Sequence, residues 1–386
     1  MTTLKGIAWD HRRCWGPLDA SVAPWRAATG QDVTWDRRSL YSFGEGDLVE
    51  FIEDYDLIVY DHPFVGDIAQ KGLMWDLAPL LTEADRTAFA ADALGRSWDS
   101  YHYAGGIWGL PLDAAAQTAA WRPDLMERAG EPVPQTLQEV LALVPRLQAR
   151  GLQVGWAAKP TDLMCTFLSL STTLGADPGR GPDGTFVPAE IAEAAIDLLR
   201  QLWPLVHPLS HGWNPIRCLD HMAATDEVAY VPWLFNYVNY STDGRIRFGG
   251  PPHLGGGTPG SVLGGAGIGI TRSCKEPDAA LAYALHLCSP EFQAGPYVGD
   301  GGQPGSRRAW TSAEADRITN GFFSATRPVL ETAWLRTREP GYVGFFHDAT
   351  LRITAVVAEG ASARDFTDWM NAAFARLAPN TEEARA

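Results

Sequence analysis

The chain has 386 residues, 46% of them hydrophobic and 20% charged, which is enough apolar mass for two folded domains. Its net charge of −15 disfavours binding to nucleic acid and to anionic membranes. No apolar stretch approaches the roughly 20 residues that span a bilayer, and five cysteines without a CxxC pair argue against a disulfide framework or a zinc knuckle.

The first 60 residues alternate strand and helix patterns. Strands are predicted at Leu4–Trp9, Asp32–Asp36 and Asp56–Tyr60, and a helix at Pro17–Thr29 ends at Gly30. Strands separated by helices at this spacing predict a parallel or mixed α/β sheet. Because the first strand follows Met1 almost at once, we expect either a cytoplasmic protein or a chain whose export signal has been removed.

The middle and the end of the chain are richer in helix patterns. Thr136 and Glu139 form a capping box before an apolar helical face, and Gly151 closes that helix. Residues 249–269 are rich in Gly and Pro, which favours a crossing between domains over a stable element. The remaining predicted elements are strands at Val154–Ala158 and Val228–Leu234 and helices at Ile191–Leu202, after Pro277, and at Ala363–Leu377.

Motifs for catalysis or metal binding do not stand out. The sequence has no P-loop and no GxSxG elbow. His207 and His211 are four residues apart, but Pro208 lies between them, which favours a loop over a zinc site. We therefore predict no catalytic residue, no metal site and no cofactor.

Five segments carry patterns of one known family, in the order in which that family has them. They are YDLIVYDHPFVGDIAQKGLMWDLAPL (55–80), YAGGIWGLPLDAAAQTAAWRPDL (103–125), PQTLQEVLALVPRL (134–147), GGAGIGITRSCKEPDAALAYALHLCSPEF (264–292) and GQPGSR (302–307). Together they resemble the extracellular solute-binding proteins of ABC importers, in particular the sugar-binding family that includes maltose-binding protein. The sequence departs from the pattern at Trp108, where Tyr is usual, and at Leu137, where Trp is usual.

The resemblance implies an α/β fold of the periplasmic binding protein type, with two lobes, a central cleft and hinge crossings. The first lobe would contain residues 1–112 and 262–309, and the second lobe residues 113–261 and 310–386. Closure of such lobes over a ligand is a hinge motion. Pro111 and the Gly-rich segment are the expected hinge strands.

Ligand-binding side chains are expected at strand ends and in the loops that follow them, because those edges face the cleft. Rings of Trp and Tyr stack on sugar faces, and Asp, Asn, His and Arg bind hydroxyls. The candidate residues are Trp9, Asp10, His11, Arg12, Asp61, His62, Asp113, Trp156, Lys159, Trp233, Asn236, Tyr237, Gly265, Gln303 and Trp310.

Each candidate has a structural alternative. Any single Trp of the 15 is more often part of a core, and the three Asp residues could instead cap neighbouring helices. A surface or turn role is as common for His11 and His62 as ligand contact. Arg12 and Lys159 leave room for an anionic ligand, such as a sugar acid or a carboxylate.

The resemblance implies a monomer that captures a small polar ligand, sugar-like or anionic, for the permease subunits of an ABC importer, without catalysis. It would work in the periplasm or at the cell surface if an export signal has been removed. Two alternatives stay open: a cytoplasmic ligand sensor, or an enzyme on the same scaffold that acts on a small carboxylate or sugar acid. The Asp and His residues at positions 10, 11, 61 and 62 motivate the enzyme alternative.

Overall fold

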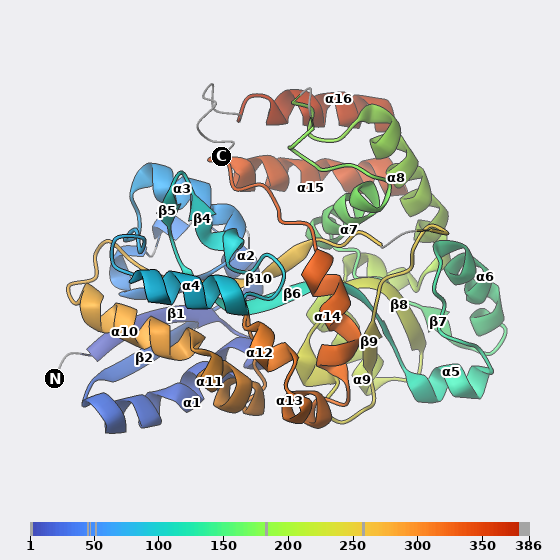
Figure 1. Ribbon diagram of the computed structural model, residues 1–386. Helices are drawn as coiled ribbons and strands as arrows, with labels where there is room; N and C mark the ends of the chain where they lie inside the picture. Colours follow the sequence, from blue (N-terminus) through green and yellow to red (C-terminus); the bar gives the residue numbers. More distant parts are fainter. Residues whose placement is uncertain are drawn as a thin grey trace.

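The structure, a computed structural model, describes residues 3–44, 46, 48–50, 52–181, 184–256 and 259–377. The described residues form two α/β lobes that lie side by side along one mixed β-sheet (Figure 1). The N-terminal strands lie in the first lobe, and most of the C-terminal third of the chain lies in the second. The predicted two-lobed α/β fold is confirmed.

Within the described residues, eight strands form the main sheet in the order β2-β1-β3-β10-β6-β8-β7, with β9 paired to β6. The short strands β4 and β5 form a separate pair. The strands are β1 (Thr3–Trp9), β2 (Asp32–Arg38), β3 (Leu57–Tyr60), β4 (His102–Tyr103), β5 (Gly106–Ile107), β6 (Leu110–Trp121), β7 (Gln153–Val154), β8 (Val228–Phe235), β9 (Arg247–Gly249) and β10 (Leu263–Ile270). β1 runs parallel to β2 and β3, whereas β10 is antiparallel to β3 and β6, so the sheet is mixed.

Strand β6 carries the chain from one lobe to the other. Its first half, Leu110–Ala116, pairs with β10, and its second half, Gln117–Trp121, pairs with β8 and β9. The sequence prediction for residues 249–269 was wrong in its second half, because Leu263–Ile270 is a strand of the central sheet. The register between β10 and β6 shifts between Ala266 and Gly267, which marks a bulge at this lobe crossing.

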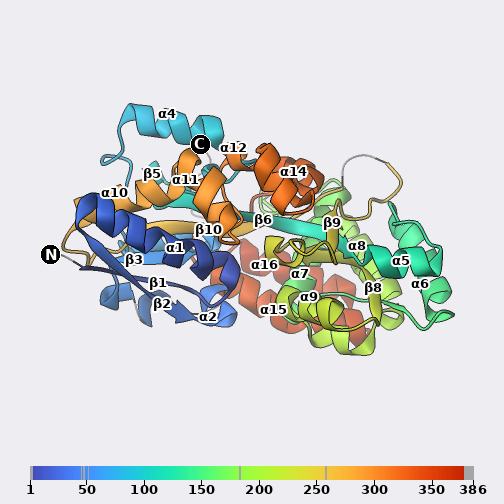
Figure 2. The same cartoon turned by 90° about the horizontal axis from the view of Figure 1, so that it is seen from below.

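The helices of the first lobe cover both faces of its strands (Figures 1 and 2). They are α1 (Arg12–Thr29), α2 (Leu40–Gly44), α3 (Val65–Lys71), α4 (Glu83–Asp92), α10 (Pro277–Cys288) and α11 (Pro290–Phe292), with single turns at Leu48–Glu50, Ile52–Asp54, His62–Phe64, Asp99–Tyr101 and Gln293–Tyr297. Helix α1 begins five residues earlier than predicted, because the His11 Nδ1 accepts the Arg13 N–H at 3.1 Å and caps the helix. Its predicted end at Gly30 is confirmed, with a left-handed φ of 74°.

The second lobe is mainly helical around β7, β8 and β9. Its helices are α5 (Pro123–Ala129), α6 (Leu137–Gln148), α7 (Pro160–Thr173), α8 (Ala189–Leu202), α9 (Pro215–Ala224), α13 (Ala313–Ile318), α14 (Phe322–Thr332), α15 (Tyr342–Ala358) and α16 (Ala363–Phe374), with single turns at Trp203–Leu205, Pro208–Gly212 and Val238–Tyr240. The short helix α12 (Arg307–Trp310) lies near the boundary of the lobes. The predicted capping box of Thr136 and Glu139 is present at the start of α6.

Each lobe has its own hydrophobic core. In the first lobe, side chains of β1, β3 and β10 pack with α1 and α10, as in the contacts around Leu18 and Leu287. In the second lobe, one core joins α6, α7, α8, α15 and α16, and another lies under α9, α14 and β8. Ala309 and Trp310, on the two sides of the predicted lobe boundary, both belong to this last core.

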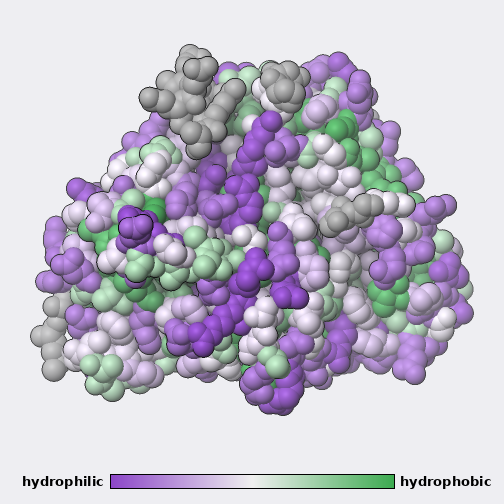
Figure 3. Space-filling model, viewed as in Figure 1, coloured by the Kyte–Doolittle hydropathy of each residue, from purple (hydrophilic) through white to green (hydrophobic). Residues whose placement is uncertain are grey.

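The two sides of β6 differ in what covers them. Figure 2 shows α4, α12 and α14 along one side of the molecule, and α2, α9 and α15 along the opposite side. On the side that faces the viewer in Figure 1, hydrophilic side chains predominate and apolar ones form separate small areas (Figure 3). The side with α2, α9 and α15 carries the cavity described next.

Candidate ligand-binding site

A cavity of about 370 Å³ lies between the lobes, within the size range of small-molecule sites. The first lobe lines it with Trp9, Arg13, Asp61, Pro63 and residues 39–41, 43 and 44 of the α2 region. The second lobe and the crossing strands contribute Ala115, Lys159, Thr161, Asp162, Cys165, Asn214, Pro215, Phe235, Tyr237, Gly264, Gly265, Arg336, Tyr342, Val343 and Phe346. The cavity therefore lies where a hinge motion would close the lobes.

Aromatic side chains from both lobes line much of the cavity. They are Trp9, Tyr41, Phe43, Phe235, Tyr237, Tyr342 and Phe346. Trp9 at the end of β1 packs against Phe43 of α2, with ring centroids 4.7 Å apart. Rings from two lobes can enclose a small ligand between flat apolar faces.

One buried ion pair lies at the base of the cavity. The Arg13 guanidinium binds Asp113 through two parallel contacts, Nε to Oδ2 at 2.8 Å and Nη2 to Oδ1 at 2.5 Å. Arg13 also donates to the Asn236 carbonyl oxygen at 2.9 Å and lies 4.4 Å from the centre of the Tyr237 ring. Arg13 thus links α1 to β6 and to the end of β8, and its charge is matched within the protein.

A second buried ion pair joins the two lobes. Asp61 follows β3 in the first lobe, and Arg336 lies between α14 and α15 in the second; Arg336 Nη2 is 2.8 and 2.6 Å from the two Asp61 oxygens. Burial alone would raise the pKa of Asp61, but Arg336 and His62 lower it to about 2. Burial, with a further contribution from Arg336, lowers the pKa of His62 to about 4, so this ring is neutral at pH 7.

Three polar groups on cavity-lining residues are buried and have no hydrogen-bond partner among the described residues. They are Trp9 Nε1, Arg336 Nε and the Tyr342 hydroxyl. Buried donors are usually paired in folded proteins, so an unpaired donor on a cavity-lining residue is a candidate for ligand contact. All three can donate to ligand oxygens.

Five of the fifteen predicted residues line the cavity: Trp9, Asp61, Lys159, Tyr237 and Gly265. Gly265 brings strand β10 against β6; its φ is +118°, and a Cβ there would lie 2.3 Å from the Asp113 carbonyl oxygen. Lys159 precedes α7, with its Nζ 5.4 Å from the centre of the Tyr41 ring.

Five more predicted residues lie directly behind the lining. Asp113 binds Arg13, and His62 contacts Asp61 through Nδ1 at 3.1 Å. The His11 ring packs edge-on against Tyr237, with centroids 4.7 Å apart. Asn236 Oδ1 accepts from the Ala116 N–H, and Gln303 donates to the Asn236 Oδ1 and to the Ala114 carbonyl, so both brace β6.

The last five lie away from the cavity. Asp10 and Arg12 are exposed, since Arg12 is the first residue of α1 and points away from the side that carries Arg13. Trp156 and Trp233 are buried in the core of the second lobe. Trp310 is buried in the neighbouring core and donates from Nε1 to the Pro304 carbonyl at 2.7 Å.

Several lining residues escaped the sequence analysis. Arg13 was missed because α1 begins before the predicted start, which puts Arg13 rather than Arg12 on the inner face. Arg336, Tyr342 and Phe346 come from the segment between α14 and α15 and from the first turn of α15. No strand precedes them, so the rule that places ligands after strands could not find them; the apolar spacing of Tyr342 and Phe346 was the available signal.

The fold and the cavity together define a two-lobed binding protein for small molecules. Residues 18–294 match the family described as bacterial extracellular solute-binding protein, and the chain belongs to that family. Proteins of this family capture solutes for transporters and normally work in the periplasm or at the cell surface.

Solved structures with the same fold cover nearly the whole chain. The maltose-bound MalE3 of T. maritima is 18% identical with a TM-score of 0.83, and the match covers 97% of this chain and 100% of that one. An ABC transporter solute-binding protein from Agrobacterium radiobacter K84, in complex with ribitol, is 18% identical with a TM-score of 0.80, covering 98% and 99%. One from Thermotoga lettingae TMO, bound to α-D-tagatose, is 16% identical with a TM-score of 0.79, covering 98% and 100%.

None of the described helices is both long enough and apolar enough to cross a bilayer.

Proposed function

We propose that the protein binds one neutral carbohydrate or polyol, of about monosaccharide to disaccharide size, between its lobes and delivers it unchanged to the permease of an ABC importer. The observation that carries this proposal is the set of aromatic side chains from both lobes that lines one cavity, where the lining residues Trp9, Arg336 and Tyr342 also carry buried donors without a partner among the described residues. Ring faces suit the C–H faces of a sugar, and the donors suit its hydroxyl oxygens. The sugar and polyol ligands of the structural relatives are consistent with this ligand class.

The charges at the cavity favour a neutral ligand over an anion. Arg13 and Arg336 would be the natural carboxylate ligands, but each is already matched by a buried aspartate, Asp113 and Asp61. An anionic ligand could bind either arginine only by displacing the aspartate that already pairs with it. Lys159 also lines the cavity, so sugar acids belong in the screen as the competing ligand class.

For the architecture, we keep the division into residues 1–112 and 262–309, and residues 113–261 and 310–386. The separate cores of the two lobes support it, and β6 with β10 would form the hinge. We further propose that the protein acts as an exported monomer, which light scattering in solution and detection of an export signal at the native gene start would test.

The test of the ligand class is a thermal-shift screen of sugars, polyols, sugar acids and small carboxylates. A ligand held at 100 times its dissociation constant adds about 2.7 kcal/mol of stability. We expect stabilisation by neutral sugars or polyols and recovery of the ligand unchanged after long incubation. Stabilisation by carboxylates alone would contradict the proposed class, and a product from the incubated ligand would contradict the absence of catalysis.

A conservative variant tests the site itself. Tyr342→Phe removes one unpaired hydroxyl from the cavity and keeps the ring, so affinity for the best ligand should fall about 3- to 10-fold. Tyr230→Phe is the matched control, because its hydroxyl is also buried and without a hydrogen-bond partner among the described residues, but Tyr230 does not line the cavity. Equal affinities for the two variants in calorimetry would exclude the Tyr342 hydroxyl from ligand binding.

A further inference from the structure

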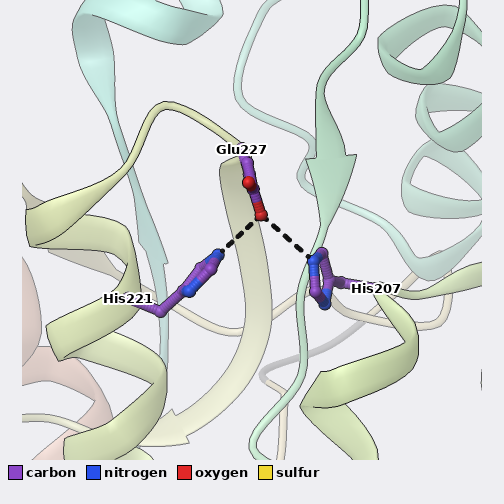
Figure 4. A group of neighbouring side chains, drawn as sticks. All are labelled: His207, His221 and Glu227. Carbon is purple, nitrogen blue, oxygen red and sulfur yellow. Dashed lines mark hydrogen bonds and ion pairs between the residues drawn. The ribbon is translucent and has the colours of Figure 1, made fainter.

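Two histidines and a glutamate meet in the second lobe, outside the ligand cavity. Figure 4 shows His207, His221 and Glu227 pointing toward one another from three segments. Their candidate ligand atoms all lie within 4.8 Å of one another. The Glu227 Oε2 is 3.3 Å from His207 Nε2 and 3.1 Å from His221 Nε2.

The two separations from the Glu227 oxygen, 3.3 and 3.1 Å, are close to the edge length of a tetrahedral metal coordination shell. Charge-assisted N–H···O bonds are about 2.7–2.9 Å long. Ligand atoms at about 2.0–2.1 Å from a tetrahedral zinc ion are about 3.3 Å apart. One carboxylate oxygen near both ring nitrogens is therefore compatible with an ion shared by the three side chains.

The three side chains are held in place by the surrounding structure. The His207 main-chain N–H donates to Val154 at the end of β7 at 2.8 Å, and Glu227 lies one residue before β8. The Trp213 ring packs on both histidines, with centroids 5.0 Å from His207 and 4.6 Å from His221. Ligands on prearranged elements lose little conformational freedom when an ion binds.

The donor set is typical of one class of metal. Two imidazoles and one carboxylate suit Zn²⁺ and similar transition metals, whereas Mg²⁺ and Ca²⁺ prefer oxygen ligands. The Glu227 side chain is 57% exposed and the histidines are nearly buried, so a fourth position would open toward solvent on the glutamate side. A His₂Glu set with one open position is a known form of zinc coordination.

Two hydrogen bonds must change for the ion to bind, because His221 Nε2 must also give up its hydrogen bond to Glu227 Oε2. His207 Nδ1 accepts the Leu209 N–H at 3.2 Å, which puts the neutral ring's proton on Nε2. Zinc on Nε2 would move that proton to Nδ1 and break this long bond. Leu209 is an exposed residue, so water can take over its N–H.

We infer that His207, His221 and Glu227 form a binding site for one Zn²⁺-class ion that ties the turn at Pro208–Gly212, helix α9 and the start of β8 together. The site is distinct from the cavity: His221 lies six residues along α9 from Pro215, about 9 Å at the helical rise. Asn214 and Pro215 at the other end of α9 line the cavity, so the ion would stabilise the helix that supports this wall. Sequence spacing could not reveal the site, because its three ligands are 14 and 6 residues apart in different elements.

The test uses the full chain stripped of metal with a chelator. We expect calorimetry to find one Zn²⁺ per chain, zinc to raise the melting temperature, and Co²⁺ to give the visible absorption of a four-coordinate ion. Ca²⁺ should not stabilise the protein. Absence of zinc binding to the wild-type chain, or equal stabilisation by Ca²⁺, would overturn the inference.

Substitutions of the proposed ligands test which side chains bind the ion. His221→Ala and Glu227→Gln should each weaken zinc binding about 100-fold or more and remove the Co²⁺ absorption. His211→Ala is the matched control from the same region, because its ring stacks on Trp203 and bonds the Trp203 carbonyl, outside the cluster. An equal loss of zinc affinity in the His211 variant would overturn the assignment of the ligands. The Co²⁺ spectrum of the wild-type chain tests for a four-coordinate site even if a variant fails to fold.

Discussion

At the scale of single residues, His62 is buried and His11 is partly buried, and the surroundings of both imidazoles oppose protonation. Burial, followed by nearby arginines, lowers the pKa of each to about 4, from an ordinary value of 6.5. Between pH 6.5 and 4 the unfolded chain therefore binds more protons than the folded one, and stability falls as the pH falls. Below pH 4, the Asp61 carboxylate, with its pKa lowered to about 2, adds a further loss as it is protonated.

We predict that the free energy of unfolding decreases by a few kcal/mol between pH 7 and pH 4.5, at up to about 1.4 kcal/mol per pH unit for each histidine. His62→Asn keeps a donor toward Asp61 but cannot be protonated, so its pH slope should be shallower by about half. His11→Asn, which can still cap α1, should reduce the slope further. Urea denaturation at a series of pH values measures this, and a slope unchanged by both substitutions would contradict the assignment.

The candidate site was partly predictable at this scale. Trp9, Asp61 and Tyr237 line the cavity because they follow strands, as the sequence analysis assumed. Asn236 also follows a strand but binds Gln303, and Asp113, which lies inside β6, binds Arg13, so both support the lining rather than form it. The sequence could not predict Arg336 as a site residue, because its partner Asp61 lies 275 positions away in the chain.

At the scale of elements, the crossing between β6 and β10 depends on one glycine. Gly265 has a φ of +118° and lies where a Cβ would meet the Asp113 carbonyl oxygen at 2.3 Å. Gly265→Ala should therefore lower stability by about 2 kcal/mol or more and weaken ligand binding, because the backbone at the cavity must shift. Gly250→Ala is the control, since a Cβ there meets nothing within 4 Å. Similar denaturation midpoints for the two variants would contradict this role.

Local signals in the sequence predicted helix ends better than they predicted the strands at this crossing. Helix ends with capping signals, such as Thr136 and Gly30, were predicted correctly because the signal is local. The glycines of 249–269 predicted a crossing between domains rather than a stable element, yet Leu263–Ile270 is a central strand, because pairing with β3 and β6 outweighs local preference. Likewise β7 is shorter than predicted, with Trp156 in the core beyond its end.

At the scale of the whole molecule, the segment between α14 and α15 binds the first lobe although its helices belong to the second. Arg336 binds Asp61, Arg338 donates to the Asp99 and His102 carbonyls, and the Tyr103 hydroxyl donates to Glu339 at 2.9 Å. The Gly341 N–H donates to Asp67 at 3.2 Å. These contacts hold the lobes together across the cavity.

We predict that loosening this segment opens the ligand-free molecule. Arg336→Gln alone would leave Asp61 buried without its ion partner, so the informative variant combines it with Asp61→Asn. The double variant should show a larger radius of gyration without ligand in X-ray scattering, and ligand affinity about tenfold weaker, equivalent to about 1.4 kcal/mol.

The control is Arg200→Gln, whose hydrogen bonds to Val356 and Ala361 lie within the second lobe. It should leave the radius of gyration unchanged. If the double variant scatters like the wild type, these contacts do not govern the spacing of the lobes.

The contacts that residues 336–341 make with the first lobe should also affect the rate of ligand release. We expect release of a captured molecule to require separation of these charged and polar contacts, so the bound state should last longer than the cavity walls alone would allow. Raising the ionic strength should shorten the time for which the ligand stays bound, because salt weakens the exposed contacts. A transporter that displaces residues 336–341 could release the ligand directly.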